Sequence, residues 1–592
     1  MERFVTRACL VGLVVLPLAE MAWRWLFKSG IPGSGPIAQH LVLWVGFLGA
    51  AIAAREGRLL ALATGAFVPE GRPRRIAEIL AGAIGAMVST LLFRASLAMM
   101  LIDKDAGEIL AIGLPRWVAE SVLPLSFALI ALRLVSRAAP TWKGRAFAAL
   151  GIVAGLAIAQ WPQFLEGQSP WVWIGVVLVG TALGGPLFAL LGGIAVFLFL
   201  KDAIPIAAVP AETYRLSVSP TLAAVPLFTL AGFFLSEGRA SQRLLRLFRA
   251  MFGWAPGGTA IVAAVVCAFF TAFTGGSGVT ILALGALLYQ ALKAEGYRDE
   301  FALGLLTACG SLGLLFPPSL PIILYGVVAQ IPIEDLFLGG ILPGILLLAL
   351  IAFYGLREGI VTKAKRTPFR WNELWGAINE AKWELMLPVI VLVAIFGGFA
   401  TIVESAALVA LYSFIIQCFV TKDLKVFRDT PRVLHHCAVL VGGVLVILGA
   451  AMGLSSYMVD AEVPAHLVAW TQTHVHSPLV FLLGLNLFLL VVGCLMDIFS
   501  AIVVVVPLIV PIGHAFGIDP VHLGIIFIAN LELGYLTPPV GLNLFLASYR
   551  FDKPMLQVTR ASLPMLAILG FGVLLITYLP WLTTALLHGA KH

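Results

Sequence analysis

Two short stretches in this 592-residue chain combine a glycine, a double proline and residues with oxygen-bearing groups. The first is Ser311-Leu-Gly-Leu-Leu-Phe-Pro-Pro318, and the second is Glu532-Leu-Gly-Tyr-Leu-Thr-Pro-Pro539. Proline lacks an N–H and disfavours the α conformation of the residue before it, so neither stretch can lie in an unbroken helix. Within a bilayer, backbone groups freed by such a break must face protein, water or an ion. Both stretches are therefore candidate binding sites for ions or polar substrates.

The two stretches belong to a longer internal repeat. Subtracting 317 from 538 gives 221, and the same offset relates Gly296 to Gly517 and Gly313 to Gly534. Helix breaks at corresponding positions of two halves are the sequence pointer to the binding site of a secondary transporter. The repeat therefore predicts a secondary transporter.

A second irregularity precedes each double proline. In the first repeat, Thr274-Gly-Gly-Ser-Gly-Val-Thr280 places three glycines and three hydroxyl residues within apolar sequence, and the repeat offset sets Asp497 opposite Gly276. Such a segment suits the tip of a hairpin at which carbonyls and hydroxyls turn inward. An aspartate among apolar residues is costly inside a membrane, so it is a functional candidate by default.

These residues form two equivalent clusters, each made of a hairpin tip and a broken helix. Oxygen ligands, mainly carbonyls with one carboxylate or hydroxyl, suit sodium, and the helix N-termini favour an anionic substrate. Alternatively, the glycines only allow close helix packing, but two motifs at equal spacing favour ion binding. The first predicted sodium site comprises Thr274, Gly276, Gly313, Phe316 and Pro318. The second comprises Asp497, Gly534, Thr537 and Pro539.

The predicted substrate-binding residues lie at the same tips and breaks. They are Ser277, Thr280, Ser319, Asn530 and Asn543. For Asn543, the alternative to substrate binding is a structural role in which its side chain clamps two segments together. Two further acids lie in apolar sequence: Glu404, for which a structural hydrogen bond is favoured over ion binding, and Glu532, which either tunes coupling or is an ordinary interfacial glutamate.

The amino-acid composition indicates that the helices carrying these residues lie in a membrane. The chain is 60% hydrophobic and 12% charged, with a mean hydropathy of +1.01. A soluble protein of this composition could not cover its surface with polar groups. Roughly 15 or more apolar stretches are long enough to span or re-enter a bilayer, at about 20 residues per span. The predicted fold class is an all-α polytopic membrane protein, an inverted-repeat transporter with two re-entrant helical hairpins, fused to a four-helix domain.

The N-terminal part predicts a four-helix domain with spans near residues 8–27, 37–54, 76–102 and 118–136. Arginines cluster after the second and fourth of these spans, whereas the loop containing Glu166 has no cation. The positive-inside rule therefore predicts a cytoplasmic N-terminus. A fifth stretch, near 146–161, supplies a connecting transmembrane helix. The predicted domains are residues 1–140, 141–170 and 171–592.

Two basic segments interrupt the second half of the chain. Glu237–Arg249 carries four arginines among leucines and is either an amphipathic interfacial helix or the end of a long transmembrane helix. Arg357–Arg370 is polar and basic and is predicted to form a cytoplasmic arm or another interfacial helix.

These motifs resemble the membrane subunits of the tripartite ATP-independent periplasmic (TRAP) transporters. Two segments resemble the large subunit: Thr274–Gly344, which includes Tyr325-Gly326, and the segment from Gly517 to Phe545. This resemblance spans roughly residues 170–585, and residues 20–75 resemble the small subunit through Arg24-Trp-Leu-Phe27. The chain is identified as a fusion of the small and large subunits.

The resemblance implies several properties. They are sodium-driven uptake of a small organic acid, an elevator mechanism in which the hairpins move against a scaffold, and a location in the bacterial inner membrane. A periplasmic solute-binding protein that delivers the substrate is implied as a partner, as is membrane lipid. The family's first sodium site uses a Ser-Gly-Ser tip, and here Thr274-Gly-Gly276 lacks the second serine.

Two other function classes compete with this interpretation. A sodium- or proton-coupled organic anion carrier that needs no binding protein would not usually bring the four-helix domain. A membrane-embedded enzyme would require a set such as HExxH, a Ser/His pair or clustered carboxylates, and the sequence has none. It also has no Walker loop, so we expect no enzymatic activity and no ATPase subunit. The formal charge of +7 arises in loops rather than on a nucleic-acid surface.

Overall fold

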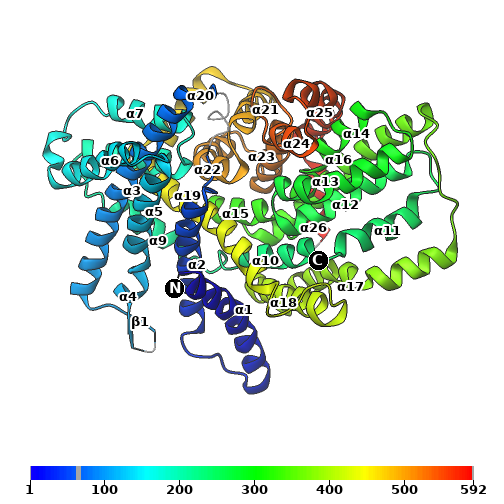
Figure 1. Cartoon of the computed structure of the whole chain (residues 1–592), viewed down its shortest axis with the longest axis horizontal. Coiled ribbons are helices and arrows are strands. Elements are labelled where there is room, and N and C mark those ends of the chain that lie inside the picture. The colour runs from blue at the N-terminus through cyan, green and yellow to red at the C-terminus, as the bar shows by residue number, and fades with distance from the viewer. Residues whose placement is uncertain (1, 62–67, 112, 590–592) are drawn as a thin grey trace. The chain divides into compact units, whose positions relative to one another are not determined.

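The computed structural model describes residues 2–61, 68–111 and 113–589, and these are mostly helical (Figure 1). Within these residues, 12 helices are long and apolar enough to cross a membrane. The helical segments Asp299–Leu315 and Leu320–Ala329 meet the same criteria only together, and they are bent by 47° at the first double proline. The predicted all-α polytopic fold is confirmed.

The chain forms two compact units. The first contains Met1–Pro226, Leu434–His466 and Val503–Pro507, and the second contains Leu227–Val433, Leu467–Ile502 and Leu508–His592. These units follow packing, whereas the predicted domains follow chain order and the family resemblance. The domain boundaries at 140 and 170 therefore stay a prediction.

The first unit contains the N-terminal helices and most of α19 (Thr430–Asp460). A β-hairpin of two short antiparallel strands, β1 (Ile109–Ala111) and β2 (Leu114–Pro115), joins α3 to α4. The helices are α1 (Glu2–Phe27), α2 (Ser34–Glu56), α3 (Arg72–Ala106), α4 (Arg116–Glu120), α5 (Val122–Ala138), α6 (Trp142–Gln160), η2 (Pro162–Phe164), α7 (Trp171–Ala182), α8 (Leu187–Lys201) and α9 (Ala208–Ser217).

Small residues set the packing of α2 in this unit. A Cβ added at Gly49 would lie 2.2 Å from the carbonyl oxygen of Ala438 in α19, and one added at Gly442 would lie 2.1 Å from the backbone nitrogen of Ala50. Glycines of this kind allow two helix backbones to approach closely, which is a main source of helix association in membranes. The stretch of α2 around Gly49 therefore forms a packing surface for α19.

The second unit contains the hairpins and breaks. Most residues of the following helices lie in it: α10 (Ala224–Glu237), α11 (Ala240–Phe252), α12 (Gly258–Thr274), α13 (Ser277–Ala294), α14 (Asp299–Cys309), η3 (Leu312–Leu315), α15 (Leu320–Ala329), α16 (Ile333–Val361), α17 (Trp371–Phe396), α18 (Ile402–Ile415), η4 (Ile416–Val420), α20 (Val463–His474), α21 (Pro478–Leu495), α22 (Ile498–Ala515), α23 (Pro520–Gly534), α24 (Leu542–Phe551), α25 (Met555–Tyr578) and α26 (Trp581–Gly589).

The internal repeat is visible in the helix bounds. Helix α13 begins at Ser277 and α22 at Ile498, while α14 begins at Asp299 and α23 at Pro520. Each pair is separated by the offset that the sequence repeat has. The two hairpins are therefore α12–α13 and α21–α22, and the two broken helices are α14–α15 and α23–α24.

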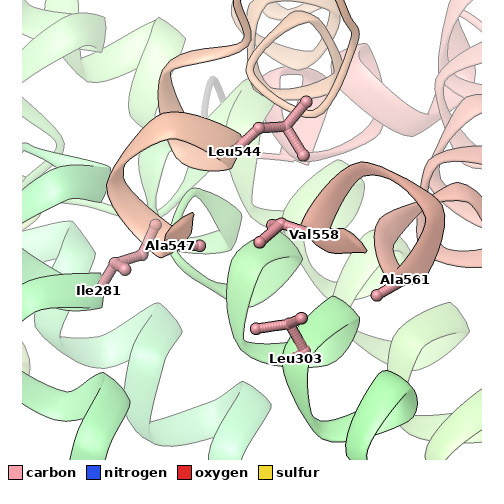
Figure 2. Packing of buried hydrophobic residues seen from close by; sticks show 6 residues of the cluster. All are labelled: Ile281, Leu303, Leu544, Ala547, Val558 and Ala561. Carbon is pink, nitrogen blue, oxygen red and sulfur yellow. The ribbon is translucent and has the colours of Figure 1, made fainter. Parts of the chain in front are cut away.

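The two repeats share one apolar core. Figure 2 shows side chains from α13, α14, α24 and α25 gathered in a single cluster: Ile281, Leu303, Leu544, Ala547, Val558 and Ala561. All six are buried, with at most 8% of any side chain exposed. Because α24 of the second repeat packs on α13 and α14 of the first, the broken helices hold each other in position.

The basic segment after Glu237 forms a helix of its own. Helix α10 ends at Glu237 and α11 begins at Ala240, so this segment is not the end of a long transmembrane helix. Arg243 of α11 bonds the Glu384 carboxylate at 2.6 Å and the Asp423 carboxylate at 2.7 Å. Burial lowers the pKa of Arg243, but these two acidic partners outweigh burial and raise it overall.

Glu404 has a structural role. Its carboxylate accepts a hydrogen bond from the Thr401 backbone N–H at 2.8 Å, and the Thr401 hydroxyl accepts one from the Glu404 N–H at 3.3 Å. This reciprocal pair is a capping box at the start of α18. The structural hydrogen bond expected for Glu404 is confirmed.

Candidate functional site

The tip of the first hairpin consists of two glycines with different conformations. Helix α12 ends at Thr274, and Gly275 follows with a φ of +67°. A Cβ at Gly275 would lie 2.5 Å from the Cβ of Leu320, the first residue of α15, so this tip faces the first break. Gly276 is extended, with a φ of −139°, and is the N-cap of α13 with no side chain to cap it.

The first break leaves helix carbonyls that other elements satisfy. The amide of Asn543, from α24, donates to the Thr307 carbonyl at 3.1 Å and to the Ser311 hydroxyl at 3.3 Å. The Thr271 hydroxyl donates to the Gly310 carbonyl at 2.8 Å. Carbonyls freed by a break in a membrane protein need such partners. Asn543 is thus a clamp across the two repeats.

Both glycines of the Gly-x-x-x-Pro-Pro motifs pack against the first arm of their own hairpin. A Cβ at Gly313 would lie 2.2 Å from the Ala268 carbonyl oxygen and 2.6 Å from the Ala272 nitrogen. A Cβ at Gly534 would lie 2.5 Å from the Gly493 Cα. Close packing is therefore one role of these glycines, and it brings the backbone of each break against its hairpin. The double prolines contain cis peptide bonds at equivalent places, Pro317–Pro318 and Pro538–Pro539.

The hydroxyl groups of the first cluster fall into two classes. Thr274 donates to the Phe270 carbonyl at 2.9 Å, and Thr280 lies 2.7 Å from the Thr271 hydroxyl. By contrast, the buried hydroxyl oxygens of Ser277 and Ser319 have no hydrogen-bond partner among the described residues. Ser277 begins α13, and Ser319 is the N-cap of α15. Unpaired buried polar atoms are costly, so these two hydroxyls are the ones suited to a ligand.

The second tip is built on Asp497, the N-cap of α22. Its Oδ2 accepts hydrogen bonds from the backbone N–H groups of Phe499 at 3.0 Å and Ser500 at 3.2 Å, and its Oδ1 accepts one from the Ser500 hydroxyl at 2.5 Å. A carboxylate has about four acceptor sites. Oδ1 therefore keeps one site for a cation, and the charge lies at the favourable end of the helix dipole.

Two hydrogen bonds join the second tip to the second break. The Tyr535 hydroxyl accepts from the Ile498 N–H at 2.6 Å, and the Cys494 carbonyl accepts from the Gly541 N–H at 3.1 Å. The Thr537 hydroxyl donates to the Leu533 carbonyl at 3.0 Å, which leaves its lone pairs available. Pro538 and Pro539 are exposed at this break, whereas Pro318 in the first is buried.

Two polar residues of α23 lie deeper in the second unit. The Asn530 amide donates to the Asn486 side-chain oxygen at 2.6 Å and to the Ile526 carbonyl at 2.9 Å. Glu532 is only 2% exposed, so it lies in the interior rather than at an interface. Neither carboxylate oxygen of Glu532 has a hydrogen-bond partner among the described residues.

Sequence reasoning missed several residues that shape the site. Tyr535, Ser500, Thr271 and Ser311 each bond a predicted site residue or its helix. The Ser500 role had a local signal, because an N-cap side chain bonds groups two or three residues later in the chain. The Asn543–Ser311 contact had none, since 232 residues separate the two positions.

Comparison of the sequence with known protein families identifies the family of this chain. The family described as "Tripartite ATP-independent periplasmic transporter, DctM component" matches residues 174–582, and the family's DctQ component matches residues 13–144. The C4-dicarboxylate TRAP transporter large permease protein DctM of Vibrio cholerae is 34% identical over 438 residues, which is 69% of this chain and 95% of that protein.

A second relative combines both components, as this chain does. The isethionate TRAP transporter permease protein DctMQ of Oleidesulfovibrio alaskensis is 35% identical over 483 residues, which is 79% of this chain and 75% of that protein. The sialic acid TRAP transporter large permease protein SiaM of Vibrio cholerae is 31% identical over 425 residues, which is 70% of this chain and 96% of that protein. The chain belongs to the TRAP transporter family, with both membrane components in one polypeptide, and is a permease rather than an enzyme.

Proposed function

We propose that this chain uses an inward sodium gradient to take up a small organic acid, which a periplasmic solute-binding protein delivers. The observation that carries the proposal is the pair of equivalent hairpin tips, each packed against a broken helix. Helix packing alone could explain one such tip and break. Two units at one offset, each with oxygen atoms left available, fit paired cation sites.

The residues at each tip fit sodium in different ways. At the first site, carbonyls of the tip and break (Thr274, Gly276, Gly313, Phe316 and Pro318) would bind the ion. At the second site, the free acceptor position on Asp497 would join the Thr537 hydroxyl and the carbonyls of Gly534 and Pro539. Sodium bound there would place a positive charge beside the substrate carboxylate. Without the ion, the only positive potential at that place would come from the helix dipoles.

The substrate would bind between the tips. The hydroxyls of Ser277 and Ser319 lie at helix starts, where the dipole favours a carboxylate. The other three predicted residues already make hydrogen bonds within the protein: Thr280, Asn530 and Asn543. We therefore propose that they hold the binding site in shape and do not contact the substrate. The relatives named above take a C4-dicarboxylate, isethionate and sialic acid, all of which are organic acids.

Transport would proceed by an elevator movement in the bacterial inner membrane. One arm of the first hairpin (α13) and part of each broken helix (α14 and α24) share an apolar core with α25, which supports their moving together. Residues 1–140 would form the small-subunit domain, 141–170 the connection and 171–592 the large permease. The small-subunit domain would enlarge the scaffold.

Uptake by purified protein tests the proposal directly. In proteoliposomes given the cognate binding protein and its ligand, we expect uptake only with an inward sodium gradient. The measurement is ligand accumulation with sodium, with potassium plus a proton gradient, and without the binding protein. Equal uptake in potassium would refute sodium coupling, and equal uptake without the binding protein would favour the binding-protein-independent carrier.

Membrane topology gives an independent test. Glu166 is exposed in the loop before α7, and Lys143 is exposed at the start of α6, on the other side of one apolar helix. With a cytoplasmic N-terminus, an impermeant maleimide should label Glu166→Cys in intact cells and Lys143→Cys only after permeabilisation. The parent protein is the blank, because five of its six cysteines are buried and Cys9 is half-buried. The reverse pattern would invert the topology.

A further inference from the structure

A cleft lies beside α11, away from the tips and breaks. Its volume is about 670 Å³, and its walls come from α11, from Leu287 of α13 and from the segment that leads into α17. Three arginines line it, Arg246, Arg249 and Arg370, together with a single carboxylate, Glu373. Among the lining residues, the arginines therefore outnumber the carboxylates.

Two of these arginines are already neutralised. Arg246 bonds Glu373 at 2.8 Å and also pairs with Glu380, and Arg249 bonds Glu295 at 2.5 Å. The side chain of Arg370 is exposed and makes no hydrogen bond or ion pair with any described residue, while its backbone carbonyl accepts the Leu374 N–H at 3.1 Å. Arg370 is also the N-cap of α17 and has no side-chain cap bond, so the first N–H groups of this 26-residue helix add to the positive potential.

The surroundings of the cleft are typical of a membrane–water boundary. Helix α11 buries Leu244 and Leu247, whereas its Arg246 is exposed and its Arg249 is half-buried. Two tryptophans of the first turns of α17 are largely exposed, Trp371 at 65% and Trp375 at 64%. Exposed tryptophans and amphipathic helices mark the headgroup level of a bilayer.

We propose that this cleft binds the phosphate of an anionic phospholipid. Arg370 and the start of α17 would bind the phosphate, and an acyl chain would lie along Leu245 and the partly exposed Leu287. Basic pockets of this kind between membrane helices bind anionic headgroups. The apolar wall favours a lipid over a soluble anion, because a free phosphate would gain nothing from leucine side chains.

The test compares two neighbouring arginine variants of the full-length protein. Arg370→Gln removes the unpaired side-chain charge from the cleft, and Arg366→Gln removes another exposed charge from the same segment but outside the cleft. Binding of phosphatidylglycerol and phosphatidylcholine to detergent-purified protein is measured by native mass spectrometry. We expect phosphatidylglycerol to bind tighter than phosphatidylcholine, Arg370→Gln to weaken it about fivefold, and Arg366→Gln to leave it unchanged.

Three results would overturn the proposal. They are equal affinity for the two lipids, equal loss in both variants, and displacement of phosphatidylglycerol by an equal concentration of inorganic phosphate. The last result would identify a soluble anion as the ligand. Because Arg370 holds no other residue in place, the thermal unfolding temperature of Arg370→Gln should match that of the parent in lipid-free detergent.

Discussion

Replacing Asp497 with asparagine should abolish coupled uptake or raise the half-saturating sodium concentration at least about tenfold. Two unit charges about 4 Å apart interact by about 4 kcal/mol at an effective dielectric constant near 20, and the amide has no charge to offer. The first site has no carboxylate at the equivalent position, Gly276, so Asp497 supplies the one full negative charge of the two predicted clusters.

The asparagine variant keeps the fold that the aspartate maintains. Asparagine is about as good an N-cap as aspartate, so the bonds to the Phe499 and Ser500 N–H groups can persist. Asp519 provides a matched control, since it caps α23 through bonds of 2.9 Å and 3.0 Å to the Val521 and His522 N–H groups. Asp519→Asn makes the same chemical change at a cap outside the predicted sodium site.

The measurement is the sodium dependence of uptake in proteoliposomes, with the amount of each variant matched. Asp519→Asn should behave as the parent. If Asp497→Asn shows unchanged sodium dependence, the second cluster is not a cation site. If both variants lose uptake equally, the effect is one of helix capping.

Local sequence rules predicted much of this architecture. Proline and glycine chemistry is local, so the two breaks and the tips near Gly276 and Asp497 could be placed to within a residue. The constant offset then paired them, and the helix starts at Ser277 and Ile498 confirm that pairing. Apolar runs likewise predicted the N-terminal spans, because the bilayer thickness sets their length.

What the sequence could not show depends on contacts between distant segments. The Asn543 clamp on Thr307 and the approach of Gly49 to Ala438 join positions with no local pattern in common. The same applies to the unpaired hydroxyls of Ser277 and Ser319, because only the folded arrangement shows which hydroxyls are already bonded. Candidate ligands could thus be proposed by type, and the structure separates those that are free from those that position the backbone.

The two glycines of the first tip should respond in opposite ways to serine. Gly275 has a φ of +67°, and a Cβ there would lie 2.5 Å from the Leu320 Cβ, so Gly275→Ser is strained by its backbone and by its neighbour. We expect a loss of about 1–3 kcal/mol in stability and loss of uptake. Gly276 is extended, and the nearest atom to a Cβ there, Cγ2 of Val279, is 3.7 Å away.

Gly276→Ser should therefore fold and transport, with a half-saturating sodium concentration equal to or below that of the parent. Gly276 is the N-cap of α13, as Asp497 is of α22, so a serine there can cap the helix and offer a hydroxyl oxygen to the ion. Thermal unfolding temperature and sodium-dependent uptake are measured for both serine variants. A folded but inactive Gly276→Ser would show that the tip needs glycine for close approach of substrate or backbone, and a fully active Gly275→Ser would show that the tip does not pack against α15 during transport.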